Sequence, residues 1–225
     1  MREREPDPFH TSPDEVEAFV VSAGELQEAI GATDGEPLPH SLREAAARQV
    51  RFVRARLEGD RHEAIETLSR LFRLGKPPQA DGRYEGELVA LSTGLLSDPF
   101  FEWLTRLYLP WLGKTMDAAA WRGDNVFTDN AWSKATGIIG WPGYRIPNED
   151  GTVRVFPFRT SITGGIEEPA VRVLRLDYSD LPNPLPVRRI VDELVELPGG
   201  YLLGKAHMRG LREFRRVAFF GLYKA

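Results

Sequence analysis

The stretch Gly82-Arg83-Tyr84-Glu85-Gly86 divides the chain into two parts with different hydrophobic patterns. Before it, apolar residues recur at the three- and four-residue spacing of amphipathic helices. After it, short segments are separated by Gly and Pro turn signals, which is typical of β-strands. The sequence therefore predicts an α+β fold, with a helical N-terminal segment over residues 1–78 and an antiparallel β-domain over residues 79–225.

The helical part is predicted to contain three helices. Two begin at capping patterns, Ser12-Pro13-Asp14-Glu15 and Ser41-Leu42-Arg43-Glu44, in which Ser caps the helix and Glu follows three residues later. The third helix begins near Asp60 and ends at Gly75. The prolines of Lys76-Pro77-Pro78 prevent it from continuing, so the helical segment stops there.

The second part is predicted to form a β-barrel. Strands are expected over about residues 84–93, 152–161, 170–178, 187–197, 201–208 and 214–224. Short turns join most of them, which indicates an antiparallel meander, and closure would protect its strand edges. Asp98-Pro99 is expected to start a short aromatic helix that ends at Pro110. Residues 117–150 show no sustained period.

Composition excludes several classes of function. The 225-residue chain has no cysteine, so disulfides and thiolate chemistry are excluded. No apolar run approaches the ~20 residues of a membrane span, and the charged start lacks the apolar region of a secretory signal. The net charge of −4 argues against nucleic acid as a partner. We therefore expect a cytoplasmic protein, and its oligomeric state stays open.

The clearest hairpin signal, Leu197-Pro198-Gly199-Gly200-Tyr201, bears on where ionisable side chains lie. A two-residue loop puts Asp192 on one face with Lys205 and His207, where they could perform acid–base chemistry. A three-residue loop shifts the register and breaks that pairing. Glu193 lies on the opposite, more apolar face, and its pKa would rise if this face lined the barrel. Whichever charges point outward would be ordinary cross-strand ion pairs.

Further residues complete the predicted binding site. Arg159 follows the aromatic Phe156-Pro157-Phe158 and would recognise a carboxylate or phosphate if it pointed inward. Tyr84 and Trp111 are expected at the barrel floor, where glycines let backbones approach closely. The predicted ligand-binding residues are Tyr84, Trp111, Arg159, Tyr178, Asp192, Glu193, Lys205 and His207.

Motifs for metal and cofactor sites are incomplete. The run from Gly199 to Ala206 nearly matches a phosphate-binding loop, but Ala206 replaces the Ser or Thr that would hold magnesium. The histidines do not have metal-ligand spacing. His207 alone could ligate a haem iron, although a single strand histidine is more typical of packing. We therefore expect no metal and no cofactor.

Three motifs together resemble the GxWxG-motif proteins of unknown function. They are Gly82-Arg83-Tyr84-Glu85-Gly86, Leu91-Ser92-Thr93-Gly94 and Trp111-Leu112-Gly113-Lys114. Here Tyr84 stands where that family has tryptophan, and Met116 where it has phenylalanine. The resemblance covers roughly residues 65–225. It implies a lipocalin-like barrel and a ligand-binding role, and it assigns no catalytic residues.

The leading functional hypothesis is binding of a small, largely apolar molecule in the cavity of a lipocalin-like barrel. The alternative is a cofactor-free enzyme on the same scaffold, a cyclase, isomerase or hydrolase acting on a polyketide- or terpenoid-like substrate. It would use Asp192 or Glu193 as its acid, with Lys205 or His207 as the proton partner. A third class, an interaction module formed by the helical part, would require an exposed apolar patch there.

Overall fold

The computed structural model describes residues 61–91, 111–129, 144–197 and 200–225. The chain divides into two compact units, Met1–Gly75 with Leu197–Gly200, and Lys76–Glu196 with Tyr201–Ala225. One helix is described in the first unit, α3 (Arg61–Leu74), where the third helix was predicted. The predicted helices that begin at residues 12 and 41, and the aromatic helix near residue 98, lie outside the described residues. The structure thus supports one of the three expected N-terminal helices.

α3 is amphipathic, as its sequence predicts. Ala64, Leu68, Leu71 and Phe72 recur at the three- and four-residue spacing of one helix face, and all four are buried. The backbone N–H of Gly75 donates to the carbonyl of Phe72 at 3.2 Å, which closes the last turn. No helix among the described residues is long and apolar enough to cross a membrane.

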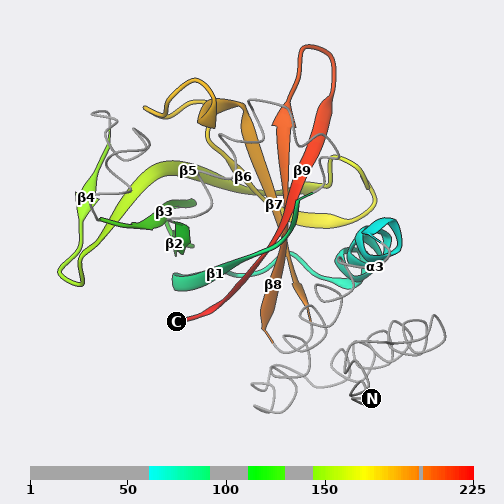
Figure 1. Cartoon of the computed structure of the whole chain (residues 1–225), viewed down its shortest axis with the longest axis horizontal. Helices are drawn as coiled ribbons and strands as arrows, with labels where there is room; N and C mark the ends of the chain where they lie inside the picture. The colour runs from blue at the N-terminus through cyan, green and yellow to red at the C-terminus, as the bar shows by residue number, and fades with distance from the viewer. Residues whose placement is uncertain (1–60, 92–110, 130–143, 198–199) are drawn as a thin grey trace, which may run out of the picture. The chain divides into compact units, whose positions relative to one another are not determined.

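Eight strands of the second unit form a closed antiparallel barrel (Figure 1). They are β1 (Gly82–Leu91), β2 (Trp111–Asp117), β3 (Arg122–Thr128), β5 (Thr152–Gly164), β6 (Arg172–Asp177), β7 (Ile190–Leu197), β8 (Tyr201–Arg209) and β9 (Phe214–Lys224). Their order is β3-β2-β1-β9-β8-β7-β6-β5, and β5 pairs back with β3. The two-residue strand β4 (Ile146–Pro147) is attached to β5. Closure pairs both edges of each of the eight strands.

The barrel confirms the predicted antiparallel β-domain, and six of its strands were expected within a few residues. β2 and β3 were not predicted. β2 starts immediately after Pro110, where an aromatic helix was expected to end, and Gly113 within it has φ +137°. β3 contains Asp124 and Asn125 in adjacent buried positions, which removes the alternation of apolar and polar residues that identifies a strand. Residues 187–189, expected at the start of β7, instead form a short 3₁₀ turn, η1 (Val187–Arg189).

Aromatic rings fill the barrel interior. Three pairs pack edge to face with ring centroids 5.5–5.7 Å apart: Trp111 with Phe220, Phe127 with Phe156, and Phe158 with Tyr178. Such pairs contribute about 0.5–1.5 kcal/mol each beyond the burial of their area. All six rings belong to one cluster of buried residues, so the interior has a continuous core.

Two glycines of the sequence motifs allow β1 and β2 to lie against each other. A Cβ at Gly86 would collide with the indole of Trp111, and a Cβ at Gly113 would collide with the carbonyl oxygen of Tyr84. Gly113 also has a left-handed φ and lies where the β2–β3 register shifts. The two positions therefore place the Trp111 ring and the chain that carries Lys114 inside the barrel.

Candidate functional site

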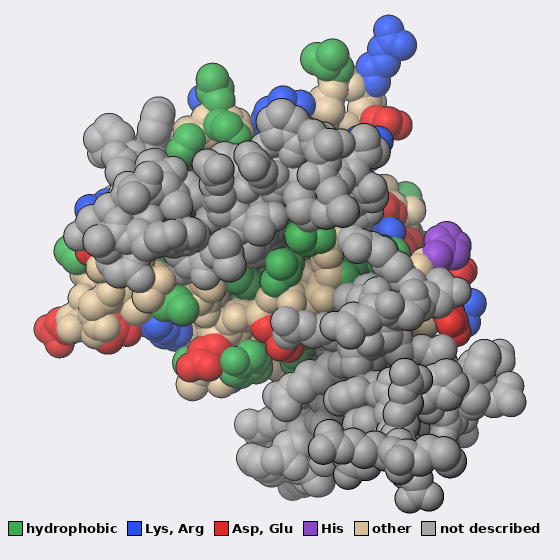
Figure 2. Space-filling model, viewed as in Figure 1, with side chains coloured by type: hydrophobic (Ala, Val, Ile, Leu, Met, Phe, Trp, Pro, Cys, Tyr) green, Lys and Arg blue, Asp and Glu red, His purple; other side chains and the backbone are tan. Residues whose placement is uncertain are grey.

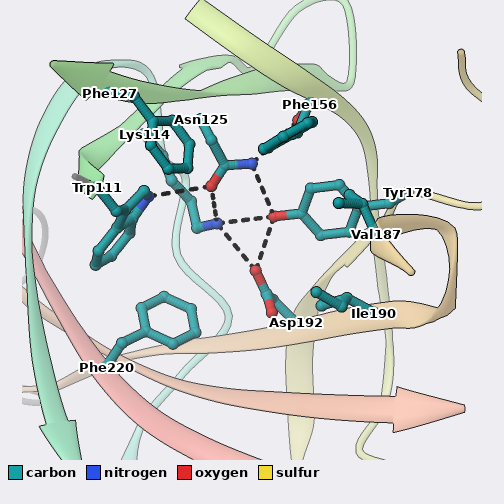
Figure 3. Close-up of a pocket in the computed structure, with 10 residues that line it drawn as sticks. All are labelled: Trp111, Lys114, Asn125, Phe127, Phe156, Tyr178, Val187, Ile190, Asp192 and Phe220. Atoms are coloured by element: carbon teal, nitrogen blue, oxygen red, sulfur yellow. Dashed lines mark hydrogen bonds and ion pairs between the residues drawn. The ribbon is translucent and has the colours of Figure 1, made fainter. Parts of the chain in front are cut away.

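Four polar side chains meet inside the barrel (Figure 3). Lys114 comes from β2, Asn125 from β3, Tyr178 from the residue after β6, and Asp192 from β7, and all four are buried. The Lys114 Nζ donates to Asn125 Oδ1 at 2.8 Å, to the Tyr178 hydroxyl at 2.8 Å and to Asp192 Oδ2 at 2.9 Å. An ammonium has three N–H donors, so all of those on Lys114 are used.

The other donors of the cluster are used as well. Tyr178 donates its hydroxyl hydrogen to Asp192 Oδ2 at 2.8 Å. Asn125 Nδ2 donates to the carbonyl of Phe156 at 3.0 Å and to the Tyr178 hydroxyl at 3.2 Å. Trp111 Nε1 donates to Asn125 Oδ1 at 3.1 Å. Every polar atom of the cluster except one carboxylate oxygen therefore has a hydrogen-bond partner.

The exception is Asp192 Oδ1. It is buried and has no hydrogen-bond partner among the described residues, whereas Oδ2 accepts from both Lys114 and Tyr178. Figure 3 shows the two oxygens pointing in different directions, with Oδ1 turned away from Lys114 and Tyr178. A buried acceptor without a partner carries a desolvation cost of about 1–3 kcal/mol, and more when it is charged.

A cavity adjoins this cluster. Its lining comprises Trp111, Lys114, Asn125, Phe127, Phe156, Tyr178, Val187, Ile190, Asp192 and Phe220. The free space is about 30 Å³, which accommodates one or two water molecules or the end group of a larger molecule. Aromatic and aliphatic side chains form most of the wall, and the polar cluster forms one end.

Aromatic rings, as well as Asp192, stabilise the positive charge of Lys114. Its Nζ lies 5.3 Å from the ring centroids of Phe158 and Phe220 and 5.5 Å from those of Trp111 and Tyr178. Cation–π contacts of this kind gain strength where water has been removed. Burial lowers the pKa of Lys114, and the charge and hydrogen bond of Asp192 act in the opposite direction.

Irregular backbone places two members of the cluster. Phe156 has φ +54° and lies in a bulge of β5, where its carbonyl meets Asn125 Nδ2. A phenylalanine in the left-handed region is strained by about 1–3 kcal/mol. Beyond β6, Asn183 Nδ2 donates to the carbonyls of Tyr178 at 3.0 Å and Pro157 at 2.9 Å, which holds the Tyr178 backbone against β5.

A second polar cluster lies on the opposite face of β7 and β8, and its members Glu193, Lys205 and His207 are buried. Glu193 Oε1 accepts from the backbone N–H of Ile166 at 2.8 Å and from Arg175 Nη2 at 3.1 Å. Lys205 Nζ donates to the carboxylates of Glu167 at 3.0 Å and Glu168 at 2.6 Å. Glu167 also pairs with Arg216 at 2.7 Å. This cluster is therefore a network of ion pairs and not part of the barrel interior.

His207 belongs to the second cluster. Its Nδ1 lies 4.0 Å from Glu193 Oε2, and neither ring nitrogen has a hydrogen-bond partner among the described residues. Burial lowers the pKa of His207 to about 4, so the ring is neutral at pH 7. Burial raises the pKa of Glu193, against the opposing effect of the hydrogen bond from Arg175.

A two-residue loop between β7 and β8 would place Asp192, Lys205 and His207 on one face of the sheet. The structure does not have this arrangement. β7 ends at Leu197 and β8 begins at Tyr201, so three residues connect them, the case in which that pairing breaks. Asp192 accordingly points into the barrel, and Lys205 and His207 share the other face with Glu193. The interpretation of Glu193 as the acid in the apolar cavity is also wrong, although its pKa is raised as that interpretation required.

The remaining predicted residues lie apart from the cavity cluster. Tyr84 is a buried core residue of β1, and Lys224 Nζ lies 4.9 Å from its ring centroid. Arg159 is exposed on β5 opposite Arg122 of β3, and it lines a surface cleft that also contains Trp121. Of the eight predicted residues, Trp111, Tyr178 and Asp192 line the interior cavity.

Sequence reasoning missed Lys114 and Asn125. Lys114 stands in the motif Trp111-Leu112-Gly113-Lys114, and that motif was the one signal available for it. Asn125 has no distinguishing signal, because it lies in a stretch without a readable period.

In the part of the chain that the structure describes, neither a charged patch on the face shown in Figure 2 nor a group of metal-binding side chains indicates a further site. On the face shown in Figure 2, the described Lys and Arg side chains are scattered among acidic and apolar ones. Within the described ranges, no group of three or more His, Cys, Asp or Glu side chains is arranged to hold a metal ion.

Comparison with known proteins adds little to this geometry. No protein-family model matches the chain, and no curated protein matches it. A solved structure of a protein from Thermomonospora curvata is similar, with a TM-score of 0.43 and 14% sequence identity. The similarity covers 77% of this chain and 98% of the other. A likeness at that level says nothing about a shared activity.

Proposed function

We propose that this barrel binds a small, largely apolar molecule in the cavity beside Asp192 and Lys114. The observation that supports it is the combination of aromatic walls with one preassembled polar cluster, the usual composition of small-molecule sites. Eight-stranded barrels either fill their interior with side chains or, as in lipocalins, hold one small ligand, and this barrel combines an aromatic core with about 30 Å³ of free space.

The free-energy cost of burying the charged groups of this cluster supports a role in binding. Removing the charges of Lys114 and Asp192 from water is expensive, and apolar residues of similar volume would often stabilise a core as well or better. A buried ion pair that is fully oriented by its neighbours instead provides a fixed electrostatic and hydrogen-bonding surface. Such preorganisation lowers the entropy that is lost when a ligand binds.

The size of the cavity limits how a ligand fits. About 30 Å³ of free space admits a polar end group with few heavy atoms. A larger apolar body requires the lining side chains, such as Val187 or Phe220, to move. We therefore place the polar end of the ligand at Asp192 and its apolar part against the aromatic rings.

The geometry gives less support to the enzyme alternative. Lys114 is held by three acceptors, so it has no lone pair to act as a base or nucleophile while it is charged. Lys205 and His207, the expected proton partners, lie on the other face of the barrel wall from Asp192. Glu193, the alternative acid, lies 4.0 Å from His207 but does not line the interior cavity. Binding without turnover therefore ranks first.

We also propose that the resemblance to GxWxG-motif proteins reflects a shared way of building this cavity. Gly86 and Gly113 make the space that the Trp111 ring occupies, and Lys114 follows Gly113 directly. On this proposal, the motif residues matter because they carry Lys114 to the interior.

Native mass spectrometry of the purified protein, compared with its denatured mass, tests the proposed function. We expect a non-covalent adduct that is lost on denaturation. Val187→Phe fills the cavity and should abolish the adduct, and Leu185→Phe, at an exposed position two residues away, should keep it. Circular dichroism confirms that both variants fold, since overpacking costs about 1–3 kcal/mol. An adduct that survives Val187→Phe would show that the molecule binds elsewhere.

A further inference from the structure

The hydrogen-bond capacity of the interior cluster is almost completely used. Its donors are the three N–H groups of Lys114, the two of Asn125, the Trp111 indole N–H and the Tyr178 hydroxyl, and each has an acceptor. Any molecule that enters the cavity therefore meets no available N–H or O–H from these side chains.

The acceptors are unequally used. Asn125 Oδ1, the Tyr178 oxygen and Asp192 Oδ2 each accept two hydrogen bonds. Asp192 Oδ1 accepts none from the described residues, although the Asp192 side chain is 95% buried and lines the cavity. Among the described residues the cluster thus has a single acceptor without a partner, and it is a carboxylate oxygen that is itself buried beside the cavity.

We infer that the ligand enters with a hydrogen-bond donor, a neutral hydroxyl or N–H group, directed at Asp192 Oδ1. This inference rests on the proposed function and specifies the chemical class of its ligand. A donor at this position satisfies the one unpaired atom of the cluster and leaves every existing bond intact (Figure 3).

The same count of donors and acceptors excludes a carboxylic acid or a simple carbonyl group as the polar end of the ligand. A carboxylate would face the Asp192 carboxylate, while the positive charge of Lys114 is already paired with Asp192 at 2.9 Å. A ketone or ester oxygen would find no available donor among the four cluster side chains Trp111, Lys114, Asn125 and Tyr178, and Asp192 Oδ1 would remain unpaired. A site with a fixed buried acceptor rejects analogues that lack the matching donor, because the acceptor is then left unpaired.

Two pairs of probes of matched shape test the inference on the full-length wild-type protein. They are 2-propanol with acetone, and cyclohexanol with cyclohexanone, and cyclohexanecarboxylate serves as the acidic probe. The readout is the NMR signal of the Trp111 indole N–H, which donates to Asn125 within the cluster. A Trp111→Phe variant assigns that signal among the five tryptophans.

We expect each alcohol to bind roughly 10- to 100-fold more tightly than its ketone, the range for a hydrogen bond to a charged group. The carboxylate should not bind. Equal affinity within the pairs, preference for the ketones or binding of the carboxylate would overturn the inference and leave the proposed function in place. No response to any of the five probes would overturn the proposed function and, with it, the inference.

A single variant provides a second, independent readout. Asp192→Asn leaves Lys114 and the Tyr178 hydroxyl donating to the new amide oxygen, so the amide N–H₂ takes the place of Oδ1 and the other bonds of the cluster are kept. The preference should then invert, with the ketones bound more tightly than the alcohols. A purely structural role of Asp192 would weaken both members of a pair equally, and that outcome would contradict the inference.

Discussion

Lys114 and Asp192 form a 2.9 Å ion pair between strands that stand opposite each other in the barrel. In the strand order β3-β2-β1-β9-β8-β7-β6-β5, three strands separate β2 from β7 in either direction. The pair therefore crosses the interior and joins residues that are 78 positions apart in the sequence.

Breaking the pair should destabilise the protein strongly. Lys114→Met leaves the Asp192 carboxylate buried without a counter-ion, at a cost of about 3–5 kcal/mol in the free energy of unfolding. Urea denaturation measures it, with Lys76→Met at an exposed position as the control. The double variant Lys114→Met/Asp192→Leu should recover most of the loss. A loss below about 1 kcal/mol in Lys114→Met would show that the pair is not essential to the fold.

Removing one hydroxyl should affect both stability and binding. Tyr178→Phe deletes the donor to Asp192 Oδ2 and an acceptor of Lys114 and Asn125, which should cost about 1–3 kcal/mol in unfolding free energy. Retention of the adduct in native mass spectrometry should fall in the same variant. Tyr223→Phe, at an exposed position on β9, is the matched control. Equal effects in the two variants would contradict the proposed importance of the cluster.

Stability should fall as the pH drops from 6.5 towards 4 because of His207. Its pKa is about 4 in the folded protein and 6.5 for an ordinary histidine, so in this window the unfolded chain binds the additional proton. Unfolding free energy therefore rises with pH through the window, by on the order of 3 kcal/mol in total. The raised pKa of Glu193 acts in the opposite direction.

The contribution of His207 is isolated by comparing the wild type with His207→Gln in urea denaturation at several pH values. The variant should have the shallower dependence between pH 4 and 6.5. Identical profiles would mean that His207 titrates normally in the folded state.

Substitution of Gly113 should test packing separately from backbone strain. Gly113→Ala introduces a Cβ against the Tyr84 carbonyl at a position with φ +137°, and should cost more than about 3 kcal/mol. Gly151→Ala has a similar left-handed requirement, φ +74°, but its Cβ would meet no atom within 4 Å. It should cost about 1 kcal/mol. Similar melting temperatures of the two variants would show that strain alone determines the effect.

The strands that the sequence revealed are those in which local signals suffice. β5 to β9 are bounded by Gly and Pro turns, so their positions could be predicted from the chain itself. β2 and β3 depend on contacts made elsewhere. A glycine is needed at position 113 because the backbone of β1 lies so close to it. Asp124 and Asn125 are buried because other strands supply their polar partners.

The candidate site could be predicted only in part, because its geometry also depends on contacts between distant strands. Tyr178 and Asp192 were selected as polar residues of barrel strands, but which face of β7 points inward depends on the length of the loop after Leu197. Lys114 comes from a strand on the opposite side of the barrel. No local pattern shows that Lys114 would meet Asp192, because only barrel closure brings them together.

The pairing of β1 with β9 and of β3 with β5 has a kinetic consequence. Residues as distant as Tyr84 and Lys224 must meet before the wall is complete, so we expect the interior cluster to assemble late in folding. A ligand that recognises the cluster acts on the closed barrel alone. Its binding would slow unfolding and leave the folding rate unchanged, which makes the lifetime of the native state the property that a ligand most directly controls.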